Sequence, residues 1–184
     1  ALLAVVNDVL SIAEGTDVTA EGGTRINLME VMEDCVDLCF EEARAAQIKI
    51  ELSGSADPLL IEGDATRLRE AVKNILGNAI KFNDAGGRVE MSAASNANGF
   101  VDLVIADTGI GMTAEDVEIA LEPFGQVDGE LARKYEGSGL GLPLAKSIIE
   151  AHGGTLLIEG FAGQGTRVCI RLPHLNSHRQ KAVA

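Results

Sequence analysis

Hydrophobic and polar residues alternate along this chain with two periods, one typical of helices and one typical of strands. Helical spacing predicts helices over residues 28–46, 64–82, 113–120 and 139–152. A period of two predicts strands over residues 48–52, 58–61, 88–94, 100–106, 154–160 and 165–172. Because these elements follow no strict β-α-β order, we predict an α+β fold, a two-layer α/β sandwich. Its helices cover one face of a mixed, mostly antiparallel sheet.

The first 24 residues differ from the rest of the chain. Residues 1–15 carry an apolar stripe too wide for a helix that rests on one surface, which predicts a stub of a helical bundle. Residues 16–24 are polar and contain several glycines, as a linker does. A main domain over 25–173 and a polar tail over 174–184 follow. Since the chain begins inside a hydrophobic pattern and without Met, we interpret it as a piece of a longer parent protein.

The charge balance restricts the partners that this fragment can have. The 28 acidic and 15 basic residues give a formal net charge of −13. The resulting field repels nucleic acid and anionic membranes, so we expect contact with neither. A phosphate ligand must then be held locally, by backbone amides, a few cations or a metal ion.

Two features of the sequence predict a cytoplasmic location. It has no apolar run of about 18 residues and no secretory leader, although the parent protein is free to be anchored in a membrane. Cys35 and Cys39 lie on the apolar face of the helix predicted over 28–46 and lack the partner ligands of a zinc site. We therefore interpret them as reduced core residues.

A polar stripe runs along the helix predicted over residues 64–82, where Glu70, Asn74 and Asn78 are spaced four apart. Such a stripe is ordinarily a solvated helix face. Asparagine carbonyl oxygens are also suitable ligands for a Mg²⁺ ion that bridges phosphates and keeps several waters. The spacing alone leaves both interpretations open.

The motif Asp107-Thr108-Gly109-Ile110-Gly111 comes directly after the strand predicted over 100–106. An acid in this position can accept a hydrogen bond from a ligand amine, while the bare glycine backbone lets a flat ring approach closely. A strand-to-helix turn with a capping acid explains the motif equally well.

A second glycine motif, Gly137-Ser138-Gly139-Leu140-Gly141, opens the helix predicted over 139–152. Glycine amides at a helix N-terminus form an anion site, because they lack backbone partners and lie at the positive end of the helix dipole. A dinucleotide-binding fold would need a strand before this loop, but Arg133-Lys134-Tyr135 precedes it. The sequence also contains no P-loop motif, so both common nucleotide-binding folds are disfavoured.

The order and spacing of these motifs resemble the histidine-kinase ATPase family of the gyrase, Hsp90 and MutL superfamily. Residues 64–82 resemble the asparagine motif of that family, and Pro123-Phe124-Gly125 and Gly163-x-Gly165-Thr166 resemble its later motifs. The resemblance covers residues 25–173 and implies the Bergerat ATP-binding fold. Residues 7–15 are similar to the end of the second helix of the dimerisation and phosphoacceptor bundle of the family. The wording of the glycine motifs is reminiscent of alphaproteobacterial hybrid and cell-cycle kinases.

The resemblance also implies a role for individual residues. Asn78 would ligate Mg²⁺ with the help of Asn74, and Lys81 would meet the phosphates of ATP. Phe82 would pack near the adenine, whose amino group Asp107 would bind. The other positions implied in ATP binding are those of the glycine motifs, namely Gly109, Gly111, Gly137, Gly139, Leu140, Gly141 and Thr166.

A mobile lid over residues 122–138 is implied as well. Within it, Arg133 and Lys134 are the cations that could reach the γ-phosphate, and solvated loop charges are the alternative. Asn83 departs from the pattern of the family, because a Ser or Thr is common in its place.

As a whole, the resemblance implies the ATP-dependent catalytic domain of a two-component sensor histidine kinase, with ATP and Mg²⁺ as cofactors. None of His152, His174 and His178 lies in the context of a phosphoacceptor. The γ-phosphoryl group would therefore go to a histidine on a bundle helix absent from this chain, and then to an aspartate of a response regulator. The bundle would make the parent protein a homodimer.

Two other functions remain as alternatives. An ATP-binding pseudokinase that acts as a scaffold would keep the same motifs. An ATP hydrolase of the superfamily would need a carboxylate where this chain has Asn74, which disfavours that alternative.

Overall fold

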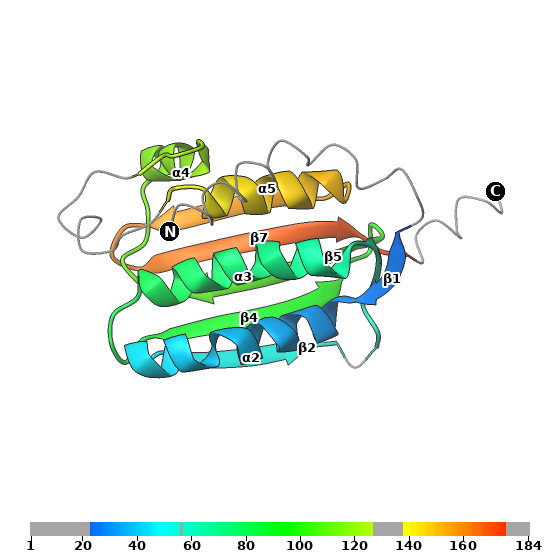
Figure 1. The fold of residues 1–184 in the computed structure, drawn as a ribbon, viewed down its shortest axis with the longest axis horizontal. Coiled ribbons are helices and arrows are strands. Elements are labelled where there is room, and N and C mark those ends of the chain that lie inside the picture. The colour runs from blue at the N-terminus through cyan, green and yellow to red at the C-terminus, as the bar shows by residue number, and fades with distance from the viewer. Residues whose placement is uncertain (1–22, 56, 127–137, 176–184) are drawn as a thin grey trace.

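The computed structural model describes residues 23–55, 57–126 and 138–175, and these form two layers (Figure 1). One layer is a five-stranded sheet in the order β2-β4-β5-β7-β6. Strands β2 and β4 pair in parallel, and the other neighbours are antiparallel. The strands are β2 (Lys49–Gly54), β4 (Arg88–Ser95), β5 (Phe100–Asp107), β6 (Thr155–Phe161) and β7 (Gly165–Pro173). The mixed, mostly antiparallel sheet predicted from the sequence is confirmed.

The second layer consists of three helices that lie side by side across one face of the sheet (Figure 1). They are α2 (Leu28–Ala46), α3 (Ala65–Lys81) and α5 (Gly141–Ala151). A short helix, α4 (Ala114–Leu121), packs against α5 and β6. The predicted α+β sandwich with helices on one face is therefore confirmed.

Side-chain caps explain where the two long helices begin. Asn27 Oδ1 accepts the N–H of Met29 at 3.3 Å, at the start of α2. Asp64 Oδ1 accepts the N–H groups of Thr66 and Arg67 at 2.8 and 3.1 Å, at the start of α3. Each bond satisfies an amide that the first helical turn leaves without a backbone partner. The predicted starts of both helices follow from these local contacts.

The hydrophobic core fills the space between the two layers. Alternate residues of the central strands face the helices and are buried: Val89, Met91, Ala93, Val101, Leu103, Ile105, Val168, Ile170 and Leu172. Because strand side chains alternate between two faces, Asp107 continues the helix-facing row of β5, and Thr166 continues that of β7. The sheet therefore directs both residues toward the helical layer.

Cys35 and Cys39 lie in this core on the buried face of α2, and both are free thiols. Burial raises the pKa of Cys35 to about 12, so the thiol is protonated at neutral pH. The interpretation of these cysteines as reduced core residues is confirmed.

A separate two-stranded sheet pairs β1 (Thr24–Asn27) with β3 (Leu60–Gly63) in antiparallel register. The sequence predicted a strand near β3 but none at β1. Ile26 is the buried residue of β1, and one apolar position among polar neighbours gives no periodic signal. The strand exists because its backbone pairs with a segment far along the chain, which local patterning does not show.

The ends of the chain lie largely outside the described residues. This applies to the predicted bundle stub over 1–15, to residues 16–22 of the predicted linker and to residues 176–184 of the predicted tail. The first two tail residues are bonded to the fold, because His174 N–H donates to Gly99 O and Leu175 N–H donates to Leu60 O. No helix in the described part has the length and apolarity needed to cross a bilayer.

His152, at the end of α5, connects two helices that are distant in sequence. Its buried ring accepts the N–H of Asp64 at Nε2, over 3.0 Å, and Nδ1 lies 2.7 Å from Ile148 O. Because Nε2 accepts this bond, the geometry places a ring proton on Nδ1, which then donates to Ile148 O. The sequence indicated only that His152 lacks the context of a phosphoacceptor, whereas the structure shows that it bridges the end of α5 and the start of α3.

Candidate functional site

Three of the sequence motifs meet along the C-terminal half of α3. Asn74 faces the first residue of α5, because a Cβ placed on Gly141 would lie 3.8 Å from Asn74 Cγ. At the end of α3, Ile110 N–H donates to Phe82 O at 3.1 Å. Asn74 and Phe82 are separated by roughly 12 Å along the helix axis. This half of α3 therefore connects the start of α5 with the motif that contains Asp107.

The two asparagines of α3 suit a hydrated magnesium ion. Asn74 and Asn78 are half-buried and lie one turn apart on the same face of the helix. The described residues contain no group of three or more His, Cys, Asp or Glu side chains that could hold a metal ion. A cation at this place would be held by amide oxygens, phosphate oxygens and water, which is the environment that Mg²⁺ prefers. The residues present fit the predicted ion.

Asp107 ends β5 and is oriented by two backbone donors. Its Oδ1 accepts the N–H of Gly109 at 2.8 Å and the N–H of Thr166 at 3.2 Å. Because these two N–H groups donate to Oδ1, the other carboxylate oxygen, Oδ2, can accept a hydrogen bond from a ligand. Burial raises the pKa of the Asp107 carboxyl, and the N–H groups of Gly109 and Thr166 oppose that rise. The predicted adenine-binding acid is thus held in place by the last glycine motif.

The glycines near Asp107 are required by the packing of the loops themselves. A Cβ at Gly109 would collide with the carbonyl oxygen of Phe82. Gly165 has a φ of +96°, and a Cβ there would collide with the carbonyl oxygen of Asp107. A Cβ at Gly111 would collide with the carbonyl oxygen of Phe161 in the same way. Gly109 and Gly111 are predicted from the sequence to make room for a flat ring, and the structure adds that neither position admits a side chain even without a ligand.

The N-cap residue of α5, Leu140, offers no side-chain cap to the first helical amides, and its own N–H donates to Ser138 Oγ at 3.3 Å. Gly139 turns the chain into the helix with a φ of +69°, and Leu140 anchors the turn by its complete burial. Pro143 lies in the first helical turn and has no N–H to satisfy. The amides of Gly141 and Leu142 are therefore the donors that this helix start can offer to an anion.

Lys81 and Phe82 lie together at the end of α3. Lys81 Nζ is 4.9 Å from the centroid of the Phe82 ring. Burial lowers the pKa of Lys81, and the negative charge of Glu42 on α2 opposes this shift. A partly buried ammonium gains from an anionic ligand, as the role predicted for Lys81 requires.

Three of the predicted site residues, Arg133, Lys134 and Gly137, lie outside the described residues, together with most of the predicted lid. The described residues on either side of that segment are in contact, since Phe124 N–H donates to Gly139 O at 3.1 Å. The roles of these three residues therefore stay predictions.

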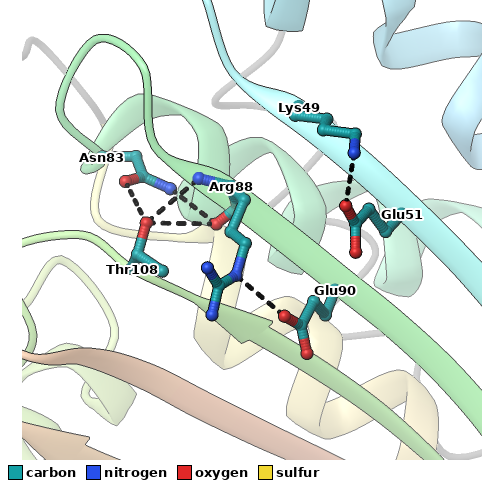
Figure 2. A network of polar contacts seen from close by, with 6 residues as sticks. All are labelled: Lys49, Glu51, Asn83, Arg88, Glu90 and Thr108. Carbon is teal, nitrogen blue, oxygen red and sulfur yellow. Dashed lines mark hydrogen bonds and ion pairs between the residues drawn. The ribbon is translucent and has the colours of Figure 1, made fainter.

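The sequence patterns predict no role for Thr108 or Asn83, although each follows a predicted binding residue. The structure brings the two side chains together, with Thr108 Oγ1 lying 3.2 Å from Asn83 Oδ1 (Figure 2). The signal in the sequence is a polar residue directly after an apolar helix end, because a buried asparagine needs hydrogen-bond partners.

Comparison with known proteins identifies the family. A family model described as histidine kinase-, DNA gyrase B-, and HSP90-like ATPase matches residues 63–176. The chain belongs to this family. The non-motile and phage-resistance protein of Caulobacter vibrioides is 35% identical over 97% of this chain and 22% of its own length. The cell-division control histidine kinase PdhS of Brucella anthropi is 34% identical over 94% of this chain and 17% of its own length.

Solved structures of the family share the fold. Full-length ShkA, crystallised in complex with AMPPNP, is 31% identical and superimposes with a TM-score of 0.80, covering 94% of this chain and 36% of that one. The chain spans 17% to 33% of the length of the curated relatives that it matches. The resemblance to the catalytic domain of sensor histidine kinases, including cell-cycle kinases, is confirmed.

Proposed function

We propose that this chain binds Mg·ATP as the catalytic domain of a two-component sensor histidine kinase. It would donate the γ-phosphoryl group to a histidine on a bundle helix outside this chain, and an aspartate of a response regulator would receive the group next. The observation that supports this most is the arrangement along α3. Two asparagine amides lie between the start of α5 and the Asp107 motif. Membership of the family supports the same function.

The adenine end of the nucleotide would be bound at the end of α3. Asp107 Oδ2 would accept a hydrogen bond from the exocyclic amine, since Oδ1 is occupied by Gly109 and Thr166. The Phe82 ring would pack near the base. A carboxylate accepts but does not donate, so this end of the site would select a base with an amino group.

The phosphates would be bound between α3 and α5. The first amides of α5 would donate to phosphate oxygens at the positive end of the helix dipole. Asn78, with Asn74, would hold Mg²⁺, which neutralises phosphate charge in a chain whose net charge is −13. Lys81 would add a further positive charge.

The chemistry of this domain is positioning and charge neutralisation. A nitrogen of the acceptor histidine would form a bond to the γ-phosphorus while the bond from that phosphorus to the bridging oxygen of ADP breaks. No covalent intermediate on this domain is needed. We further propose a cytoplasmic location and a parent protein that is a homodimer through its bundle.

Phosphotransfer to an added acceptor tests this function. The chain is incubated with Mg²⁺ and γ-labelled ATP, alone or with the bundle of its parent protein. We expect acid-labile label on the bundle and none on the chain itself, because the donor site is present and its own histidines lack an acceptor context. A bundle with its acceptor histidine replaced by Gln is the matched control. Label on this chain alone would contradict the proposal, and ATP binding without labelling of the bundle would favour the scaffold alternative.

Asn74→Glu distinguishes a kinase from a hydrolase. Asn74 points toward the start of α5, and its amide cannot accept a proton from water at neutral pH. A glutamate at this place should raise slow ATP hydrolysis and lower phosphotransfer to the bundle. The gain is expected to be about 100-fold, the lower end of what a general base contributes.

Phosphate release at saturating Mg·ATP measures this effect, with ATP affinity determined separately. Asn74→Gln is the control, because it has the length of glutamate without the charge. If the glutamate variant binds ATP normally and hydrolyses it no faster, residue 74 does not protect ATP from water.

A further inference from the structure

Asn83 is a buried polar residue at a junction of three chain segments (Figure 2). It follows Phe82, the last residue of the asparagine motif. Its Nδ2 donates to Arg88 O at 3.1 Å, and its Oδ1 accepts the N–H of Asp84 at 3.1 Å. The side chain thus ties the end of α3 to the first residue of β4.

Thr108 completes the junction from the Asp107 motif. Its hydroxyl accepts the N–H of Arg88 at 3.0 Å and lies 3.2 Å from Asn83 Oδ1, to which it donates. Its own N–H donates to Arg88 O at 3.2 Å. A Cβ at Gly87 would collide with Asn83 Oδ1, so the turn before β4 is shaped to admit this network. Thr108 therefore holds the backbone of Arg88 on both its N–H and its carbonyl.

The junction lies beside the two groups that would bind the ends of ATP. Thr108 follows Asp107, which would bind the base. Asn83 follows the helix whose Asn78 would bind the metal ion and phosphates. One nucleotide must reach both groups, and a small error in their separation weakens binding strongly.

We propose that Asn83 and Thr108 form a latch that fixes Asp107 relative to α3 and so sets the affinity of the site for the adenine end of ATP. Both are positioning residues, and the proposal rests on the proposed ATP-binding function. The ion pairs Lys49 with Glu51 and Arg88 with Glu90, drawn in the same figure, join exposed side chains on the sheet and do not belong to the latch.

Thr108→Val tests the latch, because valine keeps the shape of threonine and removes both its donor and its acceptor. Thr108 is exposed, so the variant is expected to fold. We expect its affinity for ATP to fall about 5- to 10-fold, the equivalent of one to two hydrogen bonds, with the affinity for inorganic triphosphate unchanged. Thr108→Ser should bind ATP as the unsubstituted chain does, because serine keeps the hydroxyl.

Glu90→Gln is the matched control. It removes the negative charge from the side-chain pair of Arg88 but leaves the backbone of Arg88 in the latch, so ATP affinity should stay that of the unsubstituted chain. Asn83→Ala should weaken ATP binding to a similar degree. Combined with Thr108→Val it should add little, since the two side chains belong to one network that holds the backbone of Arg88.

Calorimetric titration of ATP and of triphosphate into each variant decides between the outcomes. Unchanged ATP affinity in Thr108→Val overturns the latch, as do equal losses for ATP and triphosphate or additive losses in the double variant. If the unsubstituted chain itself binds no ATP, the proposed function is wrong, and the latch proposal fails with it.

Discussion

Asp107→Asn is expected to weaken ATP binding by about 1 to 3 kcal/mol, or roughly 5- to 150-fold. In the present structure the N–H groups of Gly109 and Thr166 both donate to Asp107 Oδ1. The Oδ1 of an asparagine can accept the same two hydrogen bonds. An amide nitrogen then takes the place of Oδ2 and sets a donor against the donor of the adenine amine. Titration calorimetry with ATP, inosine triphosphate and inorganic triphosphate measures the effect. The inosine nucleotide, which carries an acceptor at that position, should lose less affinity than ATP, and inorganic triphosphate should lose none.

The same substitution should leave the unliganded domain at least as stable. Burial raises the pKa of Asp107, so the folded state holds its proton more tightly than the unfolded state. The contribution of this group to the free energy of unfolding is therefore present below its unfolded pKa and is lost as pH rises through the folded pKa. At neutral pH the buried carboxylate carries a cost that a neutral asparagine removes. We expect an equal or higher melting temperature for the variant.

Asp102→Asn is the matched control, because Asp102 lies on the same strand but on the opposite face of the sheet. This substitution removes the negative charge from the ion pair with Arg171, in which Arg171 Nε lies 2.6 Å from Asp102 Oδ1. ATP affinity should stay unchanged in this variant. A lower melting temperature for Asp107→Asn, or an equal loss of ATP binding in both variants, would show that residue 107 acts through the fold rather than through the base.

Asn78→Leu is expected to abolish the dependence of ATP binding on Mg²⁺ and to lower phosphotransfer by about 100-fold or more. The leucine has nearly the shape of asparagine but offers no oxygen to the ion. Even residues that only support metal ligands cost about 10- to 100-fold when they are removed, so a direct ligand should cost at least as much. Calorimetry with and without a chelator, followed by labelling of the bundle, measures both quantities.

Two further variants separate the metal from the helix. Asn78→Asp keeps an oxygen ligand and should keep the dependence on Mg²⁺. Lys73→Ala alters an exposed position of α3, and its ATP binding and phosphotransfer should match those of the unsubstituted chain. The unsubstituted chain is expected to bind ATP better with Mg²⁺ than with chelator. If Asn78→Leu shows the same preference, Asn78 is not a ligand of Mg²⁺.

Much of the fold could be predicted because its signals are local. The caps Asn27 and Asp64 bond to amides two or three residues away, so the starts of α2 and α3 are encoded within one turn. The strands of the sheet show apolar and polar alternation because one face of the sheet packs on helices. Asp107 and Asn78 stand in motifs whose spacing is equally short in range, and their chemical roles remain predictions.

By itself, the sequence determined the described elements other than β1, the sandwich of helices on one sheet face, the family and the motifs that a nucleotide would need. Only the tertiary structure decided how those motifs are joined. Asp107 Oδ1 meets the N–H of Thr166, 59 residues away, and His152 meets the N–H of Asp64, 88 residues away. Contacts of this range leave no periodic trace in the sequence, because they depend on which segments the closed core brings side by side. For the same reason β1 and the contact between Asn83 and Thr108 became visible only once the sheet and helices were packed.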